Sequence, residues 1–163
     1  MSLRPTLRYR CISDIPVEKL REMNIRLILA DMDNTLAPWH STEVPAESKA
    51  WVKRVQEAGI PVLLLTNSKS ENADITAKSL EIEAVKNARK PMKKPTEQLL
   101  AQWGVSPQEA LIIGDQLFTD IQLANALGAK SVLLEPLSPE EWWCTKVFNR
   151  SRERLVWPFL FRK

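Results

Sequence analysis

A short apolar run, Leu27-Ile-Leu-Ala30, ends directly in two carboxylates one residue apart, Asp31 and Asp33. The run is long enough for a buried strand. If the strand continued past its end, residues 31 and 33 would point to the same side, so both carboxylates could reach one small volume. Two such anions repel each other unless a divalent cation with oxygen ligands lies between them. An Asx-type turn after the strand is the alternative, because Asp and Asn favour such turns.

Further apolar runs follow, and they alternate with stretches of helical periodicity. Strands are predicted at residues 60–65, 83–85, 110–113 and 131–134. Helices are predicted after Pro16 and over residues 45–58, 71–80, 95–103 and a segment through Ala126, whereas residues 1–15 are expected to be irregular. This alternation predicts an α/β fold, a doubly wound, Rossmann-like parallel sheet of about five strands with helices on both faces.

Composition is typical of one globular domain spanning residues 1–163, because 163 residues that are 44% hydrophobic can bury a core of ordinary size. The net charge of +3 permits an anionic partner without arguing for nucleic acid. Cys11 and Cys144 have no metal-type spacing, so we expect free thiols in a reducing compartment. We expect neither a membrane span nor a signal peptide.

Polar side chains follow the predicted strands where each strand ends. In a parallel sheet with right-handed crossovers these ends meet at one edge, where ligands bind. The residues expected there are Asp31, Asp33, Thr66, Asn67, Lys90 and Asp115. Carboxylates, a hydroxyl and a lysine suit phosphoryl transfer, since a metal and the lysine neutralise phosphate charge while one carboxylate attacks phosphorus. A second carboxylate can act as general acid and then as base.

Four motifs carry a resemblance to a known superfamily. They are Asp31-Met-Asp33-Asn-Thr35, the strand closed by Thr66, Lys90-Pro91, and Gly114-Asp115-x-x-x-x-Asp120. Their order and placement resemble those of the haloacid dehalogenase (HAD) superfamily of phosphatases, over roughly residues 27–134. Each motif alone is common, but the combination is specific.

The resemblance implies roles for these residues. Asp31 would be the nucleophile and Asp33 the general acid and base. Mg²⁺ would be held by Asp31, Asp115 and the backbone carbonyl of Asp33, and Asp120 would support the metal or the lysine.

The resemblance implies that Thr66 and a lysine bind the transferring phosphoryl group, and the adjacent Asn67 is expected to bind phosphate beside them. Two lysines, Lys90 and Lys94, precede a proline. Lys90 follows the third predicted strand closely and is preferred. Lys94 opens the next predicted helix and is expected to be a second phosphate contact.

No cap domain is expected, because the segments between the first three motifs have room only for a loop, helices and strands of the sheet. The site should therefore be open to large substrates. The loop over it carries Trp39 and is interpreted either as a flap or as an aromatic plug at the edge of the core.

The form of the motifs is similar to that of the cap-less (subclass III) phosphatidylglycerophosphate phosphatase family of bacteria, plastids and mitochondria. That resemblance implies phospholipid biosynthesis, with Mg²⁺-dependent removal of the terminal phosphate from a phosphorylated lipid headgroup. The protein would be cytoplasmic, or in the equivalent organelle compartment, and peripheral to an anionic membrane. Nucleic acid is not expected as a partner.

Residues 138–163 form a basic, aromatic C-terminal extension, which includes Trp142 and Trp143 beside Arg150 and Arg152. Aromatic and cationic side chains together suit a bilayer interface. A C-terminal helix that packs on the sheet would have the same composition.

Two alternatives to a lipid phosphatase stay open. One is a soluble HAD phosphatase for a small phosphate ester or a nucleic-acid end. The other is a receiver-like phospho-acceptor signalling domain, which is disfavoured because receivers place the Lys-Pro after the last strand, whereas here it precedes Gly114-Asp115.

Overall fold

The structure is a computed structural model, and it describes residues 3–137 of the chain. The basic, aromatic extension 138–163 and Cys144 lie outside the described residues. Cys11 is a free thiol, as predicted.

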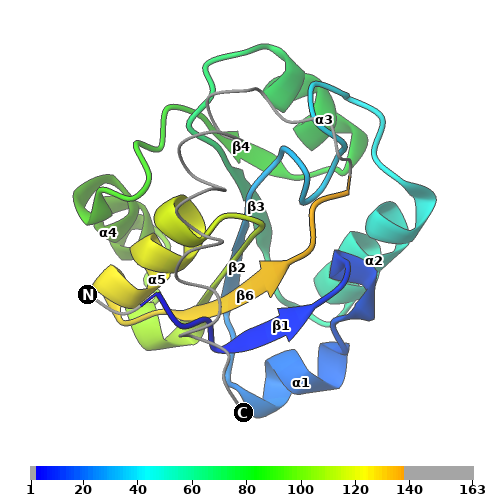
Figure 1. Cartoon of the computed structure of the whole chain (residues 1–163). Coiled ribbons are helices and arrows are strands. Elements are labelled where there is room, and N and C mark those ends of the chain that lie inside the picture. The colour runs from blue at the N-terminus through cyan, green and yellow to red at the C-terminus, as the bar shows by residue number, and fades with distance from the viewer. Residues whose placement is uncertain (1–2, 138–163) are drawn as a thin grey trace.

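Six parallel strands form one sheet in the order β1-β6-β5-β2-β3-β4 (Figure 1). The strands are β1 (Leu7–Tyr9), β2 (Leu27–Ala30), β3 (Val62–Leu65), β4 (Glu83–Val85), β5 (Ala110–Gly114) and β6 (Lys130–Leu134). The strand β2 lies inside the sheet, hydrogen-bonded to β3 on one side and to β5 on the other. The predicted doubly wound α/β fold is confirmed.

The sixth strand, β1, lies in the stretch that was expected to be irregular. It pairs with the edge of β6, where Leu7 stands opposite Val132. Two reciprocal bonds hold its start, because Thr6 N–H donates to Ser131 Oγ and Ser131 N–H donates to Thr6 Oγ1, each at 3.1 Å. A three-residue, partly exposed strand has too little periodicity to be recognised in the sequence, so its formation depends on this tertiary pairing.

Five α-helices connect the strands: α1 (Val17–Glu22), α2 (Ala46–Glu57), α3 (Asn72–Ser79), α4 (Lys93–Gln102) and α5 (Gln122–Leu127). Short 3₁₀ turns occur at Ile12–Asp14 and Pro107–Glu109, and a π-helical turn, Leu117–Ile121, precedes α5. The helix α4 begins two residues before the predicted start. Pro95 therefore lies in the first turn, where its missing N–H costs no helical hydrogen bond.

Both faces of the sheet are covered, because alternate residues of each strand enter different cores. Ile28 and Ala30 of β2 pack with residues of α1, α2 and α3. Leu27 and Leu29 pack with residues of α4 and α5. Figure 1 shows α4 and α5 on one side of the sheet and α1 and α2 on the other. This double coverage explains why β2 is apolar at every position.

Within residues 3–137, no helix is long and apolar enough to cross a membrane.

One buried side chain ties α2 to the segment before α1. Trp51 is fully buried, and its Nε1–H donates to the carbonyl of Ile15 at 2.8 Å. We expect Trp51→Phe to lower the free energy of unfolding by about 1–3 kcal/mol, because the Ile15 carbonyl would be left buried without this donor. Urea denaturation measures the change.

The matched control is Trp103→Phe, since Trp103 is 38% exposed. It should change stability by no more than about 0.5 kcal/mol. Equal stability of Trp51→Phe and the wild type would contradict the role given to this hydrogen bond.

Candidate active site

The carboxyl ends of β2, β3 and β5 surround an open pocket of ≈ 310 Å³. It is lined by Asp31, Asp33, Trp39, Thr66, Asn67, Ser68, Lys90, Gln116 and Thr119. Five of the predicted site residues are thus brought together by the topology, although they are distant in sequence. Trp39 lines the pocket and is half-buried, which favours the flap interpretation over a core plug.

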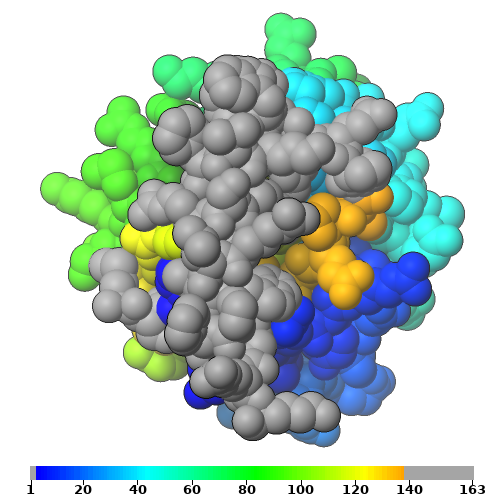
Figure 2. All heavy atoms as spheres, viewed as in Figure 1, coloured from blue at the N-terminus to red at the C-terminus, as the bar shows by residue number. Residues whose placement is uncertain are grey.

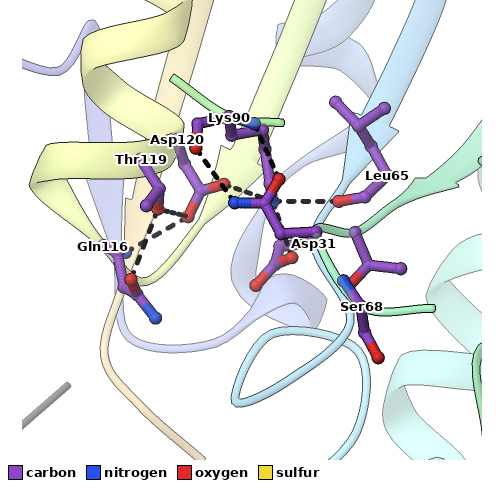
Figure 3. Close-up of polar contacts among 9 residues, drawn as sticks. Asp31, Leu65, Ser68, Lys90, Gln116, Thr119 and Asp120 are labelled. Carbon is purple, nitrogen blue, oxygen red and sulfur yellow. Dashed lines mark hydrogen bonds and ion pairs between the residues drawn. The ribbon is translucent and has the colours of Figure 1, made fainter. Parts of the chain in front are cut away.

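The ammonium group of Lys90 lies at the centre of the site (Figure 3). It is buried, and Nζ donates to Asp31 Oδ1 at 2.6 Å, to Asp120 Oδ1 at 2.7 Å and to the carbonyl of Leu65 at 2.9 Å. All three donor hydrogens of the ammonium therefore have acceptors. The lysine joins the ends of β2 and β3 to the turn that carries Asp120.

Asp120 is positioned by the π-helical turn Leu117–Ile121. Its Oδ2 accepts from Thr119 Oγ1 at 3.2 Å and from Gln116 N–H at 3.4 Å. The carboxylate also lies directly over Gly114, where an added Cβ would come within 2.2 Å of Asp120 Cγ. Gly114 is therefore needed for close packing of this carboxylate rather than for a left-handed backbone.

Three carboxylates form the cluster that could hold a metal. Asp31, Asp115 and Asp120 each place an oxygen within 4.8 Å of the others. Hard divalent cations prefer such oxygen ligands, and three carboxylates with one lysine leave an excess of negative charge. The donor set therefore fits a metal site.

Asp33 is not part of this cluster. Its side chain is half-buried and its Oδ1 accepts from the backbone N–H of His40 at 3.3 Å. The metal contact predicted for Asp33 uses its backbone carbonyl and not its side chain. The side-chain carboxylate lines the pocket and contacts the loop that carries Trp39 and His40.

Burial dominates the electrostatics of the site. It raises the pKa of Asp31 to about 7, because Lys90 offsets the loss of water only in part while the nearby Asp120 raises the pKa further. Burial also raises the pKa of Asp33 above its usual range. For Lys90, burial alone would lower the pKa, but the two carboxylates raise it above its ordinary value, so the ammonium stays charged.

Asn67 lines the pocket, and its side-chain amide also binds the backbone of Lys90. Its Oδ1 accepts from the backbone N–H of Lys90 at 2.6 Å, and its Nδ2 donates to the Lys90 carbonyl at 2.9 Å. Both ends of the amide thus hold the backbone of the lysine. Thr66 is buried beside it, and its Oγ1 accepts from Ser68 N–H at 3.1 Å.

The structure does not bring Lys94 to the pocket. Lys94 is exposed in the first turn of α4 and is absent from the pocket lining. Lys94 is the second residue of α4, and its exposed side chain lies outside the pocket lining.

Sequence reasoning missed Ser68, Gln116 and Thr119 as lining residues. Each lies within four residues of a predicted site residue, so a signal existed. That signal was their position in the loops after the strands, not the type of side chain. The sequence does not show which residues of these loops face the pocket, because this depends on the loop conformation.

Residues 2–137 match the profile of the family described as mitochondrial PGP phosphatase. The chain belongs to this family. It is 32% identical over 152 residues to the probable phosphatase YqeG of Bacillus subtilis, covering 93% of this chain and 88% of the relative. It is also 29% identical to phosphatidylglycerophosphate phosphatase 1 of Arabidopsis thaliana, covering 84% of this chain and 42% of that protein.

Solved structures of other proteins share the fold of this chain. One is a HAD-superfamily hydrolase of subfamily III A from Legionella pneumophila, at a TM-score of 0.51 and 21% identity, covering 61% of this chain and 58% of that one. Another is 3-deoxy-D-manno-octulosonate 8-phosphate phosphatase of Moraxella catarrhalis. Its TM-score is 0.53 at 15% sequence identity, and the match covers 71% of this chain and 80% of that one. The protein is a phosphatase with the HAD fold, as the motifs predicted, and residues 3–137 contain no cap domain.

The carboxylate cluster can be tested with Mg²⁺ alone. If the cation binds the native state, MgCl₂ at a hundred times Kd should stabilise the protein by about 2.7 kcal/mol and raise Tm. Asp115→Asn should reduce this Mg²⁺-dependent shift, because it removes one anionic ligand. Differential scanning fluorimetry, run with and without EDTA, measures both shifts.

Asp74→Asn is the control, since Asp74 pairs with Lys86 on the surface away from the cluster. It should keep the wild-type Mg²⁺ shift. A shift of equal size in Asp115→Asn would rule out the cluster as the binding site.

The amide of Asn67 can be tested by truncation. Asn67→Ala removes both bonds to Lys90, and a misplaced lysine should lower kcat by about ten- to a hundredfold. Ser70→Ala, in the same loop but outside the pocket, should keep kcat. Steady-state hydrolysis of p-nitrophenyl phosphate gives kcat for each variant, and an unchanged kcat in Asn67→Ala would show that Lys90 is held without this amide.

Proposed function

We propose that this protein is a Mg²⁺-dependent phosphomonoesterase that converts phosphatidylglycerophosphate to phosphatidylglycerol at a membrane surface, through an aspartyl-phosphate intermediate. The observation that carries the proposal is the buried Lys90 between Asp31 and Asp120 in an open pocket. The family match and the relatives named as phosphatidylglycerophosphate phosphatases support the choice of substrate.

In the first half of the proposed reaction, a carboxylate oxygen of Asp31 attacks phosphorus. The bond between phosphorus and the glycerol oxygen breaks, and Asp33 gives its proton to that oxygen. The raised pKa of Asp33 favours the protonated form that this step needs. Lys90 and Thr66, with nearby backbone N–H groups, hold the phosphoryl oxygens.

In the second half, Asp33 takes a proton from water, and the water oxygen attacks the phosphorus of the aspartyl phosphate. The bond to Asp31 breaks, so phosphate leaves and the nucleophile is regenerated. Mg²⁺ held by Asp31, Asp115 and the backbone carbonyl of Asp33, with Asp120 in support, would supply positive charge to the transferring phosphoryl group.

An open pocket supports a substrate that is too large to be enclosed. The described residues that line the pocket come from the loops after β2, β3, β4 and β5, and Trp39 belongs to the loop after β2. A lipid headgroup could enter while its acyl chains stay in a bilayer. We therefore propose that the protein acts at an anionic membrane, in the cytoplasm or in an organelle. The names of two relatives assign those proteins to mitochondria or chloroplasts.

The proposal is tested by phosphate release from phosphatidylglycerophosphate in mixed micelles, beside p-nitrophenyl phosphate, each with MgCl₂ or with EDTA. We expect Mg²⁺-dependent release with a higher kcat/KM for the lipid. Asp31→Asn should abolish release from both substrates while circular dichroism stays native, because a neutral amide is a poor nucleophile.

A higher kcat/KM for the soluble ester would replace the lipid by a small phosphate ester and keep the roles of Asp31 and Asp33. Turnover by pure Asp31→Asn would contradict the aspartyl-phosphate mechanism.

A further inference from the structure

The loop that delivers Lys90 to the pocket is cationic and contains no acidic residue. Residues 86–94, the loop after β4 and the first two residues of α4, include five cations: Lys86, Arg89, Lys90, Lys93 and Lys94. Only Lys90 is buried, and the other four are exposed. This segment runs along the molecular surface (Figure 2). Arg89 directly precedes the pocket-lining Lys90 in the chain, and Lys93 and Lys94 follow it within four residues.

A second loop adds another cation to the same rim. Ser68 lines the pocket, and Lys69 follows it and is exposed. Two backbone hydrogen bonds join this loop to the first one, since Asn87 N–H donates to Ser68 O at 3.1 Å and Ala88 N–H donates to Thr66 O at 2.9 Å. Lys69 and Arg89 therefore lie on two segments that are hydrogen-bonded to each other, and each of them is next in the chain to a pocket-lining residue, Ser68 and Lys90 respectively.

Some of these charges are neutralised within the protein and others are not. Lys86 pairs with Asp74 at 2.5 Å and Lys93 with Glu97 at 3.3 Å. Within residues 3–137, no carboxylate pairs with Lys69, Arg89 or Lys94. These three cations are available to an anionic partner.

An apolar side chain lies among them. Met92 is 59% exposed, one of three large apolar side chains that are exposed in the described part of the chain. Its backbone N–H donates to Arg89 O at 2.8 Å, which places it in the same turn. Exposure of a flexible apolar side chain costs free energy in water, and burial among lipid acyl chains would recover it.

We propose that Lys69, Arg89, Met92 and Lys94, the docking rim, are the face that binds an anionic lipid bilayer and holds the pocket over a lipid headgroup. The inference rests on the proposed function and assigns membrane contact to the described domain itself. Charge complementarity favours anionic lipid, and Met92 favours a bilayer over nucleic acid, which would use stacking aromatic side chains.

The test is sedimentation with vesicles of phosphatidylcholine containing phosphatidylglycerol, compared with phosphatidylcholine alone. Lys69→Glu/Arg89→Glu should lower affinity for the anionic vesicles by about tenfold or more, since each cation near an anionic surface contributes about 1 kcal/mol. The control is Lys53→Glu/Arg54→Glu on α2, which changes the same charge at two exposed positions outside the rim. It should keep most of the wild-type affinity.

A second pair of variants tests insertion of the apolar side chain. Met92→Asp should weaken vesicle binding, whereas Met92→Leu, which keeps an apolar side chain of similar volume, should preserve it. Unchanged binding of Met92→Asp would remove Met92 from the docking rim, and unchanged binding of Lys69→Glu/Arg89→Glu to the anionic vesicles would overturn the proposal. So would tighter binding to a single-stranded oligonucleotide than to the anionic vesicles through the same residues.

Failure of the docking rim and failure of the lipid activity give different results. If the wild type binds anionic vesicles through the rim but releases no phosphate from phosphatidylglycerophosphate, the docking rim stands and the substrate assignment falls. If the wild type hydrolyses the lipid and Lys69→Glu/Arg89→Glu binds vesicles as tightly as the wild type, the substrate assignment stands and the rim falls.

Discussion

The site depends on one ammonium group held between carboxylates out of contact with bulk water. Burial of these charges is costly unless each is paired and hydrogen-bonded. Lys90 meets that condition with three acceptors from three different segments of the chain. Any shift of β2, β3 or the π-helical turn would break one of these contacts, so the packing of the sheet edge and the electrostatics of the pocket are a single constraint.

The burial of Lys90 also explains the contacts between the two loops that carry Asn67 and Lys90. A buried lysine must be directed inward while its neighbours remain in water, and Asn67 achieves this by binding both polar groups of the Lys90 backbone. The loop can then present its remaining cations outward. Charge neutralisation inside the pocket and excess positive charge outside it thus come from one short segment.

Much of this architecture is predictable from sequence, and the exceptions have physical reasons. The apolar run before Asp31 has no polar position, which predicts a strand buried on both faces. The ends of the other strands are predicted from apolar runs in the same way. The strand β1 was missed because its three residues gain their stability from β6. The contact of Asn67 with the Lys90 backbone and the position of Lys94 outside the pocket lining could not be predicted. Residue type suggests a phosphate contact, whereas side-chain direction depends on the backbone of the loop and on where α4 begins.

Gly114 shows how a catalytic geometry can depend on a missing atom. Asp120 occupies the space that any side chain at this position would fill. A single methyl group there would displace the carboxylate that shares Lys90 with Asp31, the proposed nucleophile, without removing any charged or reactive group from the protein. A protein that has all the aspartates and the lysine of this pocket therefore also needs the glycine at this position to hold them in the same geometry. A sequence of this kind that keeps every ionisable residue of the pocket but lacks this glycine should be suspected of being a pseudoenzyme.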